Sequence, residues 1–235
     1  MTHARRSGAL QDVNLALALY RQQQWDAAAG RLERLLAHDS TRDDLRIALG
    51  DCLLRLHRPR QAAECFARCL GSASQAPALF GQAVACQMLR RFDESEAAYG
   101  RFLEWEPRSE EALANLVALS MERLDMDRVQ RYAGRLLEIA PDSCAALQGL
   151  IVAAASRGDF GQAGIHLQRL LELLPRSQIF RNDPAVPSDR LDRDENGTLL
   201  YFMNRAGSER LARTHHSFFE PGAVTGIAAR TLARR

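Results

Sequence analysis

The sequence has 235 residues, of which 46% are hydrophobic and 26% are charged, and its formal net charge is +2. These fractions are ordinary for a soluble protein, and the small net charge excludes a partner that is held chiefly by electrostatic attraction. All 31 basic residues are Arg and none is Lys, which indicates a GC-rich genome and therefore a bacterial protein.

The N-terminal residues carry no pattern typical of a secretion signal. Arg5 and Arg6 are followed by a polar run, and the apolar run from Leu15 to Tyr20 is short. No stretch approaches the roughly 18 apolar residues that a membrane span requires. We therefore expect a flexible N-terminus over residues 1–8, no membrane partner and a cytoplasmic location.

Further along the chain, apolar residues recur at spacings of three and four, which predicts amphipathic helices. These helices come in pairs. The first members carry Leu15 and Leu19, then Leu45, Leu49 and Leu53, then Leu113 and Leu116, then Leu147, Leu150 and Ile151. The second members carry Leu32 and Leu35, Phe66 and Cys69, Tyr99 and Phe102, Leu136 and Leu137, and Leu167 and Leu170.

A period of 34 residues, with one step of 33, runs through these pairs. Its most regular position holds small or compact residues: Ala28, Ala62, Ser95, Val129 and Ala163. Three residues earlier stand Trp25, Pro59, Phe92, Met126 and Phe160. Four residues later stand Leu32, Phe66, Tyr99, Ala133 and Leu167. Thirteen residues before the compact position stand Leu15, Leu49, Gln82, Leu116 and Leu150. The last three periods end with Pro107, Pro141 and Pro175.

This pattern resembles the tetratricopeptide repeat (TPR) family, whose unit has an early Leu-Gly pair, an aromatic residue, an Ala, a further apolar residue and a closing Pro. The resemblance implies an all-α solenoid of helix-turn-helix repeats forming a right-handed superhelix. The repeats are expected at 9–42, 43–75, 76–109, 110–143 and 144–177. Only the second has the full pair, Leu49-Gly50, and Ser40 and Ser74 replace the closing Pro of the first two.

The resemblance also implies a concave groove lined by the first helix of each repeat. Carried over by position, the partner-binding residues are Val13, Leu17, Tyr20, Arg21, Ile47, Asp51, Leu54, Arg55, Phe80, Val84, Gln87, Met88, Met121 and Glu122. The centre of this set is apolar, which suits an amphipathic helix or an apolar peptide. Family members that bind chaperone tails use Lys and Asn at two of these positions, and this chain has neither residue at them.

The expected function is therefore a non-catalytic scaffold or assembly chaperone that binds another protein or peptide. Several alternatives stay open: the chain could fill its own groove, or the repeats could regulate an attached, divergent enzymatic segment. An Arg-rich tail could also contact nucleic acid, although most such runs are solvated helix ends. The sequence does not predict the oligomeric state.

No catalytic motif and no cofactor fingerprint occurs in the sequence. Cys65 and Cys69 are one helical turn apart, but a zinc site needs two more ligands. An odd number of cysteines in a cytoplasmic protein is typical of buried thiols. We therefore expect neither an enzyme nor a metal site.

The repeat pattern stops after Pro175, so residues 178–235 are expected to form a separate C-terminal module. Asn196-Gly197 favours a β-hairpin over 188–202, and one or two helices follow it. The same stretch has the first half of a calcium loop, from Asp192 to Asn196. Met203 stands where that loop needs a bidentate Glu, which favours the hairpin.

Overall fold

The computed structural model describes residues 2–173, with side chains from residue 11 onward. This part of the chain forms ten helices and no strand: α1 Thr2–Arg21, α2 Trp25–His38, α3 Asp43–Arg55, α4 Pro59–Ala67, α5 Gln75–Met88, α6 Phe92–Trp105, α7 Glu110–Glu122, α8 Met126–Ile139, α9 Cys144–Ser156 and α10 Phe160–Leu173. Helix α1 begins at Thr2, within the stretch expected to be flexible. The predicted C-terminal module, with its hairpin and helices, lies outside the described residues.

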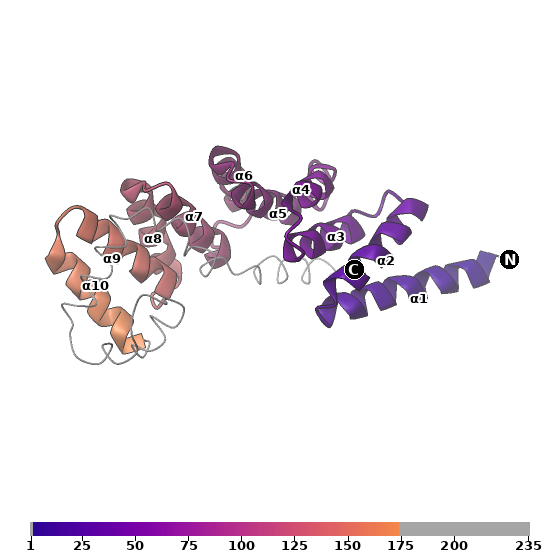
Figure 1. Cartoon of the computed structure of the whole chain (residues 1–235), viewed down its shortest axis with the longest axis horizontal. Helices are drawn as coiled ribbons and strands as arrows, with labels where there is room; N and C mark the ends of the chain where they lie inside the picture. The colour runs from indigo at the N-terminus through magenta and orange to yellow at the C-terminus, as the bar shows by residue number, and fades with distance from the viewer. Residues whose placement is uncertain (1, 174–235) are drawn as a thin grey trace. The chain divides into compact units, whose positions relative to one another are not determined.

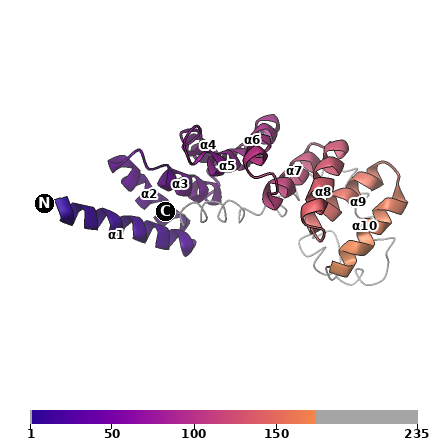
Figure 2. The same ribbon diagram turned by 180° about the vertical axis from the view of Figure 1, so that it is seen from behind.

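The helices are arranged as consecutive hairpins in two compact units, α1–α6 and α7–α10 (Figure 1). In the first unit α1 packs on α2, α3 on α4 and α5 on α6, and contacts of α2 with α3 and of α4 with α5 join the hairpins (Figure 2). In the second unit α7 packs on α8 and α9 on α10, while α8 contacts α9. First helices of successive hairpins also touch, α3 with α5 and α7 with α9. The prediction of an all-α solenoid is confirmed.

In every hairpin the first helix ends in the same backbone turn. One residue of the turn has a positive φ between 56° and 75°, and in the five hairpins this residue is Gln23, His57, Arg90, Leu124 and Gly158. At Leu124 its N–H donates to the carbonyl of Met121, and the next N–H, of Asp125, donates to the carbonyl of Ser120, both at 3.0 Å. The same two bonds recur at the other four turns. This is the Schellman motif, which satisfies the last carbonyls of a helix.

Four of these turns place a side chain where glycine is favoured, and we expect Leu124→Gly to stabilise the second unit. A left-handed backbone costs a residue with a Cβ about 1–2 kcal/mol, whereas glycine adopts it freely but loses more entropy on folding. Since 56% of Leu124 is exposed, little packing is lost. Urea denaturation should show a gain of about 0.5–1 kcal/mol. In the helical control Gln130→Gly, a loss of about 1 kcal/mol is expected, and similar losses in both variants would contradict the strain argument.

The core lies where the 34-residue period places it. The compact residues of the period are all fully buried: Ala28, Ala62, Ser95, Val129 and Ala163. The apolar residues four positions later are also buried: Leu32, Phe66, Tyr99, Ala133 and Leu167. Ser95 satisfies its hydroxyl by donating to the carbonyl of Ala83 at 2.8 Å. Each second helix therefore packs through one narrow stripe and exposes its other face.

The residues that stand thirteen positions before the compact residue of each period differ in how deeply they are buried. Leu49 and Leu116 are buried, but Leu15 is 42% exposed, and Gln82 and Leu150 are only partly buried. In the described residues no hairpin precedes α1, so nothing covers Leu15.

Two glycines of the first unit make room for the Phe66 ring, one in its own hairpin and one in the next. The Phe66 ring of α4 lies against Gly50 of α3 and Gly81 of α5. A Cβ on Gly50 would come 2.6 Å from the ring, and one on Gly81 would come closer still. Because real Cβ contacts are longer, both positions require glycine while the Phe66 ring stays in place. Phe66 thus joins the second hairpin to the third.

Candidate functional site

The predicted groove residues belong to the first helices, and the structure buries many of them. The buried members are Tyr20, Ile47, Asp51, Leu54, Phe80, Val84, Gln87 and Met121. The partly exposed members are Val13, Leu17, Arg55, Met88 and Glu122, and Arg21 is exposed. The physical reason is that a first helix packs against its own partner and against helices of neighbouring hairpins. It therefore buries several faces, whereas a second helix buries one.

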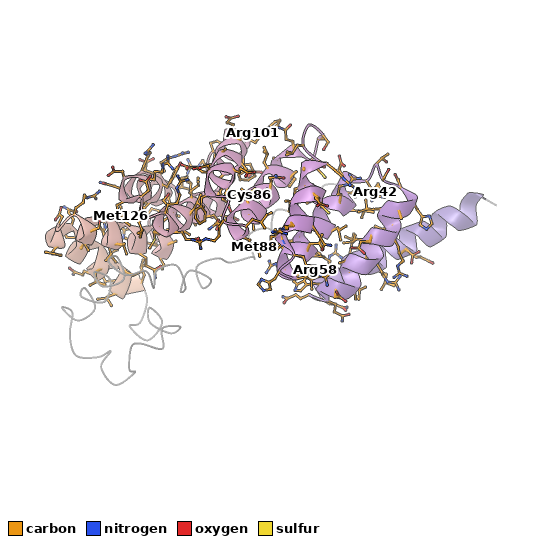
Figure 3. The ribbon with its side chains drawn as sticks, turned by 45° about the horizontal axis from the view of Figure 1, so that its top comes forward. Arg42, Arg58, Cys86, Met88, Arg101 and Met126 are labelled. Atoms are coloured by element: carbon orange, nitrogen blue, oxygen red, sulfur yellow. The ribbon has the colours of Figure 1, made fainter. Side chains whose placement is uncertain are left out.

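Phe80 requires a correction of its expected role. Its side chain is fully buried, and its ring meets the rings of Tyr99 and Phe102 edge to face at 5.6 and 5.2 Å. Both partners belong to α6, so Phe80 holds α5 against α6 within one hairpin. It is a packing residue and not an accessible peptide contact. Met88, at the end of α5, is one of several partly exposed residues of this helix, and in the view of Figure 3 its label lies on the other side of Cys86 from Arg101.

Four side chains of the first unit form a polar and aromatic group that we call the Asp51 cluster: Tyr20, Trp25, Asp51 and Arg55. The Tyr20 hydroxyl donates to Asp51 Oδ2, which links α1 to α3. Arg55 Nε lies 4.0 Å from Asp51 Oδ1, and the Arg55 guanidinium stacks over the Trp25 ring at 5.3 Å. The Tyr20 and Trp25 rings meet edge to face at 5.4 Å. Sequence reasoning selected three of these residues but did not foresee Trp25 as their partner.

Burial dominates the electrostatics of this cluster. Asp51 is inaccessible to solvent, which raises the pKa of its carboxyl to about 6, while the Tyr20 hydrogen bond and the Arg55 charge act in the opposite direction. Burial also raises the pKa of Tyr20, and the Asp51 charge adds to that effect. Tyr20 therefore stays protonated and serves as a hydrogen-bond donor. The Asp51 cluster fixes the relative positions of α1, α2 and α3.

Two kinds of feature are absent from the described residues. Between residues 2 and 173, no group of three or more His, Cys, Asp or Glu side chains is placed to hold a metal ion. Over the same range no helix combines the length and the apolar character that crossing a membrane demands. The first helices of the first unit carry several partly exposed side chains at the predicted groove positions: Val13, Leu17, Arg55 and Met88.

The cysteines divide into a buried and a partly exposed group. Cys52, Cys69 and Cys86 are buried, and burial raises the thiol pKa of Cys52 to about 12 and that of Cys69 to about 11. Cys65 and Cys144 are only partly buried. The thiolate is the reactive species, so protonated core thiols react slowly.

We expect iodoacetamide at about pH 8 to alkylate Cys144 and Cys65 first. The three buried thiols should react only after denaturant is added, because their access requires unfolding. Peptide mass spectrometry of a time course resolves the five sites. Alkylation of Cys86 as fast as that of Cys144 in native protein would contradict the described core.

Comparison with known proteins agrees with this geometry. The family model described as "Tetratricopeptide repeat" matches residues 19–85, which span most of the first unit. Residues 19–85 are therefore similar to tetratricopeptide repeats, and the helices of the described residues form a TPR solenoid. Among curated proteins, none matches this sequence.

Solved structures share the TPR fold at low sequence identity. A crystal structure of MamA is 17% identical, with a TM-score of 0.63 over 67% of this chain and 93% of that chain. MamA 41-end from Desulfovibrio magneticus RS-1 is 16% identical, with a TM-score of 0.66 over 72% of this chain and 96% of that chain. YrrB, described as a TPR protein with an unusual peptide-binding site, is 15% identical, with a TM-score of 0.60 and coverages of 71% and 87%. These similarities extend the TPR fold beyond the residues that the family model matches.

Proposed function

We propose that this TPR protein is a non-catalytic scaffold, of the kind that assists assembly, and that it binds an apolar or amphipathic peptide of another protein. The binding surface is formed by the first helices of the first unit. The observation that carries the proposal is that α1, α3 and α5, the first helices of three hairpins in one unit, each have a partly exposed side chain at a groove position: Leu17, Arg55 and Met88. The peptide-binding site of YrrB, a protein of the same fold, supports it.

The mode of binding follows from these side chains. Leu17 and Met88 supply apolar contact, and Met adapts its shape to different partners. The Arg55 guanidinium lies over the Trp25 ring, 5.3 Å from its centre, and this contact orders the side chain before a ligand binds. An ordered side chain loses less conformational entropy on binding. We propose a bacterial scaffold located in the cytoplasm, and the exclusive use of Arg, which is typical of a GC-rich genome, supports the bacterial origin.

The test compares wild type with the double variant Leu17→Arg and Met88→Arg. Partners retained by each protein in extracts of the native host are identified, and the retained segment is then synthesised and titrated against purified protein by fluorescence anisotropy. The double variant should lose about tenfold or more in affinity, because apolar contacts become charges, while its circular dichroism and melting stay near wild type. Exposed Arg101 offers the matched control Arg101→Leu. Equal affinity of a folded double variant and wild type would place the peptide elsewhere.

A further inference from the structure

The first unit also contains a cleft on another side of α3. It lies between α2 and α4 above α3 and has a volume of about 350 Å³. From α3 it is lined by Arg46, Leu49 and Leu53. At about 100° per residue these three lie almost opposite Asp51 and Arg55 around the helix. The cleft is therefore separate from the proposed peptide-binding surface.

The floor of this cleft is apolar. Leu49 and Leu53 of α3 are 7% and 3% exposed, and Leu36 of α2 is partly exposed beside them. Cys65 of α4 adds a thiol whose pKa is raised by burial, so it is present as a neutral, weakly polar group. A cavity of this size is at the lower end of the range for ligand sites and is suited to one or two side chains.

Charged side chains surround that floor, two of them acidic and two basic. Glu33 of α2 and Glu64 of α4 are exposed at the cleft. Arg46 is 8% exposed, and its guanidinium is already bound to the Asp43 carboxylate and to a backbone carbonyl. With Arg46 paired, the remaining charges at the cleft are the two carboxylates of Glu33 and Glu64 and the guanidinium of Arg68. A positively charged group on a ligand would complement the two carboxylates.

We infer that the α2–α4 cleft binds a segment of a protein partner that carries a leucine-like side chain flanked by Arg or Lys. The apolar side chain occupies the floor over Leu49 and Leu53. The basic side chains lie at Glu33 and Glu64. Two binding faces on one unit let the scaffold hold two segments at once, which raises the overall affinity for a protein that contains both.

The probe is a fluorescein-labelled peptide, Gly-Ser-Arg-Leu-Leu-Arg-Ser-Gly, titrated against the full chain by anisotropy, beside a second peptide with Glu in place of Arg. We expect the Arg peptide to bind at least about tenfold more tightly. The double variant Glu33→Arg and Glu64→Arg should remove this preference. Glu104→Arg, an exposed charge reversal on α6, should preserve it. Equal binding of the two peptides by wild type would overturn the inference.

Two thiols locate the bound peptide within the same chain. Cys65 lines the cleft, whereas Cys144 lies on α9 in the second unit. Saturating Arg peptide should slow alkylation of Cys65 and leave that of Cys144 unchanged. If Cys65 is not protected, and Leu17→Arg with Met88→Arg abolishes binding instead, the cleft is not the site although the proposed function stands. A last comparison uses the double variant Arg234→Glu and Arg235→Glu without added peptide. If Cys65 is alkylated faster in this variant than in wild type, the chain's own C-terminus occupies the cleft, and binding of an external partner is refuted.

Discussion

Phe66→Ala is expected to lower the free energy of unfolding of the first unit by about 3–5 kcal/mol, the cost typical of removing a buried aromatic side chain. The ring is fully buried and fills the space between Gly50 and Gly81. Its loss leaves a cavity that two glycines cannot fill. The reduction is measured by urea denaturation monitored by circular dichroism.

The reciprocal variant makes this expectation specific. Gly81→Ala should destabilise wild type by about 1–3 kcal/mol, because the new Cβ collides with the Phe66 ring. In the Phe66→Ala background the same substitution should be neutral or stabilising, since alanine is the better helix former and fills part of the cavity. Gly100→Ala serves as the control, because nothing lies within 4 Å of a Cβ there. Additive effects of Phe66→Ala and Gly81→Ala would show that the ring does not contact Gly81.

Asp51→Asn is expected to change how the stability of the first unit depends on pH. The carboxyl pKa is raised from 3.8 to about 6 in the folded protein, so the folded state keeps a proton that the unfolded state releases. The stabilisation from this group is full below about pH 4 and is lost as pH rises through about 6. At about 1.4 kcal/mol for each pKa unit, the loss approaches 3 kcal/mol.

Asn cannot ionise, so the free energy of unfolding of the variant should rise relative to that of wild type as pH increases. At about pH 8 the variant should be as stable as wild type or more stable. Urea titrations of both proteins from about pH 4 to pH 8 measure the difference. Tyr20→Phe is the companion variant: it removes the hydroxyl that donates to the carboxylate and should destabilise by about 1–3 kcal/mol, mainly at high pH. A difference between wild type and Asp51→Asn that is constant with pH would show that Asp51 titrates normally.

The periodic part of the fold was predictable because packing between hairpins depends on residue size at fixed intervals. Ala28 and Val129 could be placed in the core from the 34-residue period alone, and both are fully buried. Leu15 could not, because its exposure depends on whether a hairpin lies before α1, and this is a property of position in the stack. Helical periodicity alone carries no such information.

The candidate site was harder to predict than the fold. Family positions identify which face of a first helix meets the groove, but not how far neighbouring helices cover that face. Phe80 is covered completely because Tyr99 and Phe102 supply two aromatic partners within its own hairpin. Trp25 was missed because its role depends on a cation from the next hairpin, Arg55. The aromatic residue itself was visible in the sequence, but a contact across hairpins was not.

The turn that ends the first helix of each described hairpin affects which substitutions the repeats tolerate. The turn is specified by backbone hydrogen bonds, and it accommodates Gln, His, Arg, Leu and Gly at the same position. The side chain at this position can therefore differ between repeats while the turn is kept. A sequence pattern that depends on residue identity does not detect such a turn. The family model matches only residues 19–85, yet the same turn recurs at Leu124 and Gly158. The backbone turn thus marks repeats that residue identity alone does not reveal in this chain.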